Sequence, residues 1–301
     1  MVSLILILFV ALMLPGLIAR TRARLSGRKG VRFYQHLNNV GVLLRKDPIY
    51  GASAGMVTRL APVVYLGATL TAALLLPVGG FGALLSFDGD VVLFCYLLGL
   101  GRLALMLGAM DAGSSFQGMG ASREALYGAF VEPALFLILG TLALVSGQVS
   151  FNGLFTEELG GRPEMLVVMI LMIYAVFKIV LVEAGRIPVD DPRTHLELTM
   201  IHEVMVLDYA GFDMALITIG GWIKTAMLAV IGASALAAAF WGTAPVIVLL
   251  ALLFGVGIGV LESVMARSRL SRNTTYIVTI IALAFVIFTI AFLVMREVSI
   301  G

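Results

Sequence analysis

Eight long apolar runs limit what this chain can fold into. A helix needs about 20 mostly apolar residues to cross the hydrocarbon core of a bilayer. Runs of that length cover residues 2–19, 58–77, 91–110, 126–147, 165–184, 213–240, 244–265 and 275–295. Because backbone polar groups in lipid must be satisfied within the segment, such runs form helices. The sequence therefore predicts an all-α integral membrane protein, a bundle of about eight transmembrane helices.

Composition agrees with a membrane protein of one domain. The chain is 60% hydrophobic and 13% charged, whereas soluble domains are about 45–50% apolar and about 25% charged. No internal repeat or linker divides residues 1–301, so we expect a single transmembrane domain with a retained first helix. The one cysteine, Cys95, excludes a disulfide framework, a cysteine-ligated zinc site and an iron–sulfur cluster held by this chain alone.

Basic residues are concentrated in one set of loops. The loops after odd-numbered helices hold 15 of the 20 lysines and arginines, namely Arg20, Arg22, Arg24, Arg28, Lys29, Arg32, Arg45, Lys46, Arg59, Arg123, Arg186, Arg193, Arg267, Arg269 and Arg272. The opposite loops hold only Arg162 and Arg296. Loops rich in Lys and Arg stay in the cytoplasm. We therefore predict that both termini lie on the outer side, and the basic residues require no nucleic-acid partner.

The segment VEAGRIPVDDPRTHLELTMIHEVMVLDYAG, residues 182–211, holds six of the 18 acidic residues and two of the three histidines. Metal-site spacings fail there, since Val206 replaces the second histidine of HExxH and no Glu-x-x-His is present, so we expect no metal. Asp191-Pro192 is a typical helix start, and Thr194 with Glu197 is a second one. The following residues are too apolar for a free loop. We expect a segment packed on protein, with its acids facing a hydrated cavity or a partner.

Six ionisable residues fall at membrane depth. They are Arg102, Glu132, Lys178, Glu183, Lys224 and Glu262. Each charge costs several kcal/mol in lipid unless it is paired or hydrated, so such residues indicate function by default. A proton relay and a set of interhelical ion pairs both fit this pattern.

Two cytoplasmic loops carry weaker signals. Residues 111–124, DAGSSFQGMGASRE, predict a glycine-rich connector, and the lack of Gly-Lys-Ser/Thr argues against a nucleotide site. In the first loop, Phe33, Leu37, Val40 and Leu43 recur at helical spacing. That amphipathic stretch fits either the membrane surface or a peripheral subunit.

Four segments together resemble one family. They are GRKGVRFYQHLNNVGVLLRKDP, DAGSSFQGMGASRE, VEPALFLILG and EAGRIPVDDPRTHLELTMIHEVMVLDYAG. They resemble the complex I subunit 1 family, which includes the quinone-chamber subunit of respiratory complex I. The same family includes the membrane subunit of group 4 energy-converting NiFe hydrogenases, such as formate hydrogenlyase subunit 4. The form THLELTMIHE resembles the hydrogenase-type branch. RIPVDDPRTHLELTMIHE departs from complex I, where an Arg-Pro-Phe-Asp run precedes several glutamates, and Asp208 stands where glutamate is usual.

The resemblance implies roles for particular residues. A proton relay would involve Glu132, Glu183, Glu197, Asp208, Asp190, Lys178, Lys224 and Glu262. A chamber wall that docks the peripheral arm would involve Arg28, Asp111, Ser115, Arg123, Glu124, Arg186, His195, His202, Glu203 and Tyr209. Arg186 and Lys178 would tune the relay carboxylates through nearby charge.

The expected protein is a membrane subunit that anchors an electron-transfer arm and couples redox chemistry to proton or sodium translocation. It would sit in the cytoplasmic (inner) membrane of a prokaryote and bind no cofactor itself. Iron–sulfur clusters and the Ni-Fe centre are expected on hydrogenase-like large and small subunits, with antiporter-like membrane subunits as further partners.

Two alternatives remain at this point. One is the quinone-chamber subunit of NADH-quinone oxidoreductase. The other is a stand-alone ion-coupled transporter with its site among Lys178, Glu183, Lys224 and Glu262; inverted repeats would support it, and none is found.

Overall fold

A computed structural model describes residues 1–155, 163–190, 201–238, 242–265 and 270–300. Within these ranges the predicted all-α membrane bundle is confirmed, with eight helices long and apolar enough to span a bilayer. The spanning helices are α1 (Val2–Leu25), α3 (Met56–Leu74), α4 (Asp90–Asp111), α5 (Ser115–Ser146), α7 (Pro163–Glu183), α9 (Gly211–Ala238), α10 (Ala244–Val264) and α11 (Leu270–Ile300). Three short helices complete the order: α2 (Gln35–Leu43), α6 (Phe151–Leu154) and α8 (His202–Met205).

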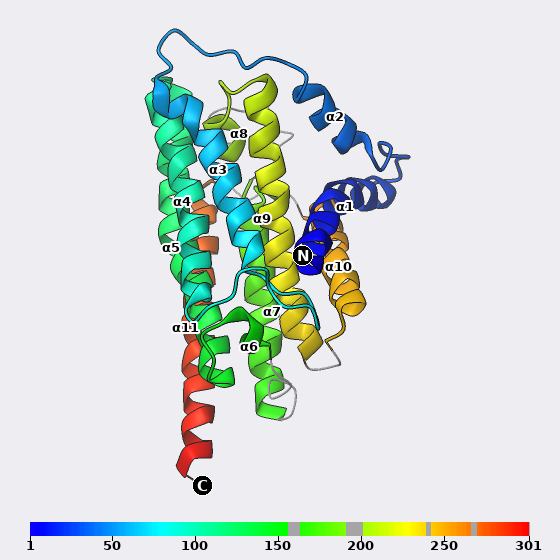
Figure 1. Cartoon of the computed structure of the whole chain (residues 1–301), viewed down its shortest axis with the longest axis vertical. Coiled ribbons are helices and arrows are strands. Elements are labelled where there is room, and N and C mark those ends of the chain that lie inside the picture. Colours follow the sequence, from blue (N-terminus) through cyan, green and yellow to red (C-terminus); the bar gives the residue numbers. More distant parts are fainter. Residues whose placement is uncertain (156–162, 191–200, 239–241, 266–269, 301) are drawn as a thin grey trace.

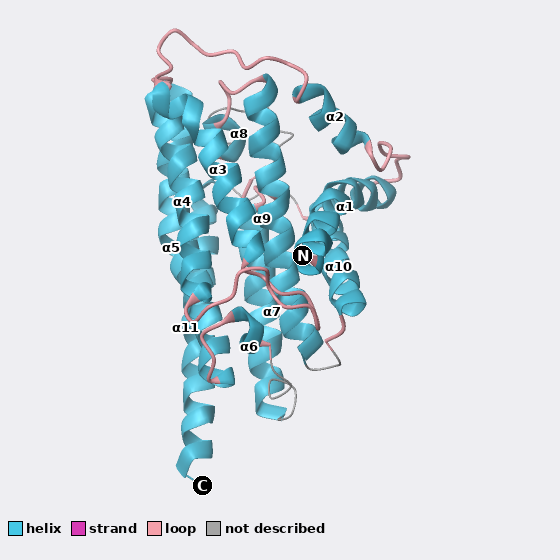
Figure 2. Ribbon diagram, viewed as in Figure 1, coloured by secondary structure: helices cyan, strands magenta, loops and turns pink. Residues whose placement is uncertain are grey.

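The connections separate into two ends of the bundle (Figures 1 and 2). Helices α2 and α8 lie at one end, which the basic loops predict to be cytoplasmic. Helix α6, the loop between α3 and α4 and the C-terminus lie toward the other end. Helix α9 packs against α3, α7, α1 and α10, while α5 packs against α11 and α4. Helix α7 in turn contacts both α9 and α5, and so joins these two groups of helices.

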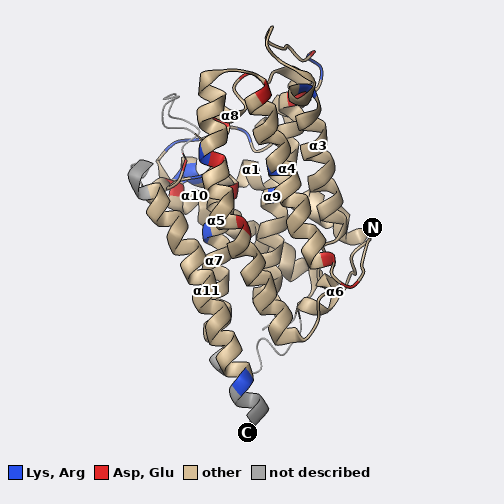
Figure 3. Cartoon of the chain, turned by 90° about the vertical axis from the view of Figure 1, so that its left-hand side faces the viewer, with Lys and Arg blue, Asp and Glu red and all other residues tan. Residues whose placement is uncertain are grey.

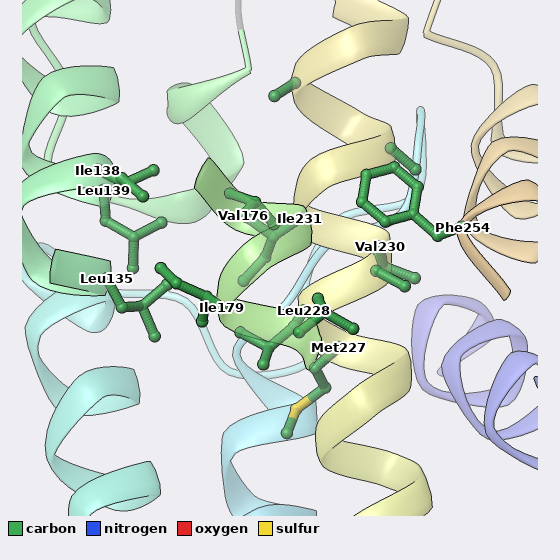
Figure 4. Close-up of a cluster of buried hydrophobic side chains, with 14 of the residues drawn as sticks. Leu135, Ile138, Leu139, Val176, Ile179, Met227, Leu228, Val230, Ile231 and Phe254 are labelled. Atoms are coloured by element: carbon green, nitrogen blue, oxygen red, sulfur yellow. The ribbon is translucent and has the colours of Figure 1, made fainter. Parts of the chain in front are cut away.

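Most of the charged residues lie in the half of the bundle away from the C-terminus (Figure 3). Further along the bundle, α5, α7, α9 and α10 bury a closely packed apolar cluster (Figure 4). The labelled members are Leu135, Ile138, Leu139, Val176, Ile179, Met227, Leu228, Val230, Ile231 and Phe254. Water has few hydrogen-bond partners among such side chains, so this cluster is dry. We call it the apolar plug.

Helix α5 begins earlier than predicted. The sequence indicated a connector over 111–124, but only Ala112, Gly113 and Ser114 separate α4 from α5. Gly113 has φ +72°, which suits glycine in a tight turn. A side chain at Gly120 would place its Cβ 2.8 Å from the backbone nitrogen of Met205. The glycines read as loop signals therefore allow a tight turn and a close approach of α8 to α5.

Two predicted helix starts, at Asp191 and Thr194, lie outside the described residues, as do His195 and Glu197. The amphipathic stretch of the first loop does form a helix, α2, with Val40 buried.

Gly232 provides a test of the apolar plug. A Cβ there would lie 2.6 Å from Phe254 and 3.2 Å from Val176, whereas a Cβ at Gly140 meets no atom within 4 Å. We expect Gly232→Ala to lower the free energy of unfolding by about 1–3 kcal/mol through overpacking. Gly140→Ala is the matched control and should be neutral or slightly stabilising. Thermal denaturation of the detergent-solubilised protein measures both; equal transition temperatures would contradict this packing.

Candidate functional site

Arg102 is the centre of a buried cluster of charges. It lies on α4 with its side chain 5% exposed. Its Nε lies 3.1 Å from Glu124 Oε1, and its Nη1 lies 3.1 Å from Glu132 Oε1. Both glutamates come from α5, one about two turns beyond the other. The third guanidinium nitrogen pairs with Glu183, the last residue of α7. One cation thus joins three carboxylates from two neighbouring helices.

A second cation completes the cluster. Lys224 of α9 pairs with the other oxygen of Glu183, and its side chain is also buried. We call Arg102, Glu124, Glu132, Glu183 and Lys224 the charge network. Each ion would be unfavourable in this environment if it stood alone. Mutual pairing is what allows four helices to bring ionised groups to one place.

Two glycines make room for these long side chains. A Cβ at Gly128 would lie 2.5 Å from Arg102 Nη1, and one at Gly99 would lie 3.3 Å from Glu132 Oε2. Gly128 therefore lets the guanidinium pass close to the α5 backbone, where it reaches Glu124 and Glu132 together.

Glu262 belongs to a separate cluster. Its two carboxylate oxygens each lie 3.1 Å from an arginine, Arg22 of α1 and Arg186 after α7. These pairs join α1, α10 and the segment that follows α7. His36 of α2 lies near both arginines; partial burial, then the charges of Arg186 and Arg22, lower the pKa of its imidazole.

Lys178 faces α11 rather than the charge network. Its Nζ donates to Thr279 Oγ1 at 2.6 Å and lies 4.3 Å from the centre of the Tyr276 ring. Lys178 and Glu183 are five residues apart, which places them on different faces of α7. Among the described residues, no contact between Lys178 and a relay carboxylate supports the predicted influence of Lys178 on these groups.

The remaining relay candidates lie in two settings. Asp190 is buried, and its Oδ2 accepts hydrogen bonds from the backbone N–H groups of Ile201 and His202 at 3.0 and 3.2 Å. It therefore fixes the start of α8. Asp208 is exposed on the loop between α8 and α9.

The predicted chamber residues are similarly dispersed. Arg28, Ser115 and Glu203 are exposed, and Arg123 is partly buried. Asp111 accepts hydrogen bonds from the backbone N–H and the hydroxyl of Thr58, both at 2.9 Å.

Tyr209 is buried against Gly108, whose lack of a side chain accommodates the phenol. Burial and then the charge of Asp213 raise the pKa of Tyr209, so the phenol stays protonated.

A cavity of about 220 Å³ lies beside the charge network. Its charged and polar lining includes Glu183, Arg186, His202, Glu203, Thr218 and Thr225, and aliphatic and aromatic side chains from α1, α3, α4, α8 and α9 supply most of the rest. Among the described residues, no group of three or more His, Cys, Asp or Glu side chains is placed to hold a metal. The chemistry available around this cavity is ion pairing and proton binding.

Comparison with known proteins identifies the relatives of this architecture. A model of the NADH dehydrogenase family matches residues 1–296. The chain belongs to the NADH dehydrogenase family. Hydrogenase-4 component C of Escherichia coli is 30% identical over 228 residues, covering 75% of this chain and 70% of that protein. Formate hydrogenlyase subunit 4 of the same organism is 32% identical over 207 residues, covering 68% of this chain and 66% of that protein.

Two proteins of lower sequence identity are also similar to this chain. An NADH-quinone oxidoreductase subunit of Koribacter versatilis is 24% identical over 210 residues, covering 66% of this chain and 47% of that protein. A chain in the structure of the membrane-bound sulfane sulfur reductase, an archaeal respiratory membrane complex, superposes with a TM-score of 0.76 at 20% identity. That match covers 96% of this chain and 97% of the other, and shows the shared fold. The expected hydrogenase-type branch of the family is confirmed by the two Escherichia coli relatives.

Sequence patterns do not locate the centre of the site. They put Arg102 at membrane depth without a functional role, and the family resemblance assigns Glu124 only to the chamber wall. Buried acids such as Glu124 and Glu183 require a cation. Three cations lie at membrane depth, Arg102, Lys178 and Lys224, and the sequence alone does not show which of them pairs with these acids.

Removing the central cation should destabilise the protein. Arg102→Gln would leave Glu124 and Glu132 without an ionic partner in the charge network, and breaking a buried pair such as Arg102–Glu124 typically costs about 3–5 kcal/mol. We expect a clear fall in the thermal transition temperature of the purified protein, while Arg24→Gln, at an exposed position, leaves it unchanged. Similar transition temperatures for the two variants would show that the network carries little stability.

Proposed function

We propose that this chain is the membrane subunit of a group 4 NiFe hydrogenase-type complex and couples electron transfer in a peripheral arm to proton (or sodium) translocation. Its membership in the hydrogenase-type branch of the family supports the assembly. The charge network beside a cytoplasmic cavity is the observation that carries the coupling role.

A proton path would begin at the cavity and continue through the network. Glu183 lines the cavity and pairs with Arg102, which also holds Glu132. A nearby cation favours the ionised form of a carboxylate, so each glutamate would bind a proton more readily when Arg102 shifts away from it and release it when Arg102 returns. A redox change in the peripheral arm would alter the electrostatic potential at the cavity. That change would shift the preference of Arg102 among its carboxylate partners.

The path would leave the chain sideways. The apolar plug packs next to the charge network, starting within about one turn of Glu183 on α7 and of Lys224 on α9, and it offers a proton no polar side chain among its labelled members. Glu132 differs from the rest of the network because its side chain is 43% exposed, and it borders a groove of about 590 Å³ along α4. That groove is lined mainly by apolar residues such as Leu93, Tyr96 and Leu100. An antiporter-like membrane subunit covering this face would receive the proton at Glu132.

The peripheral partners would dock at the end that carries α2 and α8. The large and small hydrogenase-like subunits would hold the Ni-Fe centre and the iron–sulfur clusters, because this chain has one cysteine to offer. The chain itself would bind no cofactor. We place the complex in the cytoplasmic membrane of a prokaryote, with both termini outside.

Two observations separate this proposal from its rivals. The cavity of about 220 Å³ is smaller than the roughly 300–1,000 Å³ usual for ligand pockets, which argues against a quinone chamber. The four residues of the transporter hypothesis lie in three places, since Lys178 contacts α11 and Glu262 pairs with Arg22 and Arg186.

The relay is tested by neutral replacements. In the complex reconstituted into liposomes, we expect Glu183→Gln and Glu132→Gln to abolish coupled ion uptake while dye-linked hydrogen oxidation by the arm continues. Glu197 stands at a position that matches the family pattern, so we expect Glu197→Gln to abolish coupled ion uptake in the same way. Asp88→Asn, an exposed carboxylate near the opposite end, is the matched control. Wild-type ion uptake in Glu183→Gln and Glu132→Gln would refute the relay.

A further inference from the structure

His202 is held between a carbonyl group and a buried carboxylate. It is the first residue of α8. Its Nε2 lies 3.1 Å from the carbonyl oxygen of Val182, and its Nδ1 lies 3.4 Å from Glu124 Oε2. A carbonyl oxygen only accepts hydrogen bonds, so Nε2 carries a hydrogen and donates it.

The other ring nitrogen of His202, Nδ1, then needs a hydrogen of its own to bond to Glu124. A neutral imidazole protonated at Nε2 has a lone pair at Nδ1, and an ionised carboxylate offers only lone pairs. Two acceptors would face each other at a site where the Glu124 side chain is 4% exposed. Among the described residues, Glu124 Oε2 has no hydrogen-bond donor. One proton placed between Nδ1 and Oε2 satisfies both atoms.

Local structure places the ring at this position. Asp190 accepts hydrogen bonds from the N–H groups of Ile201 and His202, which anchors α8. Gly185 has φ +57°, and a Cβ there would lie 2.6 Å from His202 Cδ2. A side chain at Gly185 would therefore be strained and would also collide with the imidazole.

His202 connects the cavity to the buried carboxylates. Its side chain is 27% exposed, in contrast to that of Glu124, and it lines the cavity with Glu183. Histidine is also the side-chain type whose charge changes between about pH 5 and 8. The charged groups around it are Glu124 from α5, Arg102 from α4, Glu183 from α7, Arg186 and Asp190 after α7, Lys224 from α9 and Glu203 from α8 itself.

We propose that His202 and Glu124 hold one exchangeable proton, and that His202 passes it from the cavity to the charge network. The transport role rests on the proposed function, whereas the bound proton does not. In each cycle Nδ1 would pass its proton to Glu124 Oε2, and the ring, which keeps its Nε2 hydrogen, would swing toward the cavity, where Nδ1 takes the next proton from water. The network would release the first proton before the ring returns to Glu124. No other bond is made or broken.

Infrared difference spectroscopy of the reconstituted complex, recorded between about pH 5 and 8, tests the bound proton. With isotope-labelled histidine, we expect coupled imidazole and carboxyl bands that disappear in both His202→Gln and Glu124→Gln. His36→Gln, which makes the same substitution on α2, should keep these bands. Their survival in His202→Gln would overturn the proposal.

Transport assays test the role of the proton. Glutamine can still donate to Val182 but cannot carry a proton charge, so we expect His202→Gln to lower coupled ion uptake on the order of a hundredfold. His202→Lys places a lasting cation beside Glu124; it should preserve thermal stability and still lose uptake, which a purely structural role would not produce. Uptake at the wild-type rate in His202→Gln would overturn the proposal.

The relay through Glu183 and Glu132 and the proton site at His202 can be disproved independently of each other. If Glu183→Gln and Glu132→Gln pump normally while the infrared bands depend on His202, the relay is wrong and the proton site stands. If those two variants lose pumping but the bands persist in His202→Gln, the relay stands and the His202 proposal is wrong.

Discussion

The structure depends on solvating one guanidinium inside a bilayer. Arg102 is fixed in α4 at a depth where an unpaired charge costs several kcal/mol, and its partners come from α5 and α7. Those helices must therefore meet at one level, and Gly128 must be small enough to let the guanidinium through. Lys224 then brings α9 to the same point. The helices must therefore pack in the arrangement that pairs these buried charges.

The sequence predicted the helices well and their pairing poorly. Spans were recognisable because bilayer thickness sets a minimum apolar length, and all eight are present in the described chain. Pairing depends on how helix surfaces fit together, which no local pattern records. Glu262 pairs with Arg22, 240 positions away, while Lys178 and Glu183 lie on the same helix without sharing a cluster. The predicted start of α5 was also too late in the sequence, because Gly118 and Gly120 are typical of a loop; the helix begins at Ser115.

Family resemblance located the important segments but not what each residue does. Within the EAGRIPVDD motif, Glu183 joins the charge network, Gly185 leaves space for an imidazole, Arg186 binds Glu262 and Asp190 anchors α8. These four functions occupy eight consecutive positions, 183–190. Their close spacing follows from geometry: a chain that leaves α7 and turns sharply meets three different neighbours within a few residues.

The apolar plug has an electrical consequence. A membrane potential is worth about 2.3 kcal/mol per elementary charge per 100 mV, and that force drives protons inward through any continuous wet path. A subunit with ionisable groups across its full thickness would short-circuit the gradient whenever the redox arm was idle. Because the apolar plug presents leucine, isoleucine and valine in place of ionisable side chains, a chain that carries protons through its charge network would also insulate the membrane.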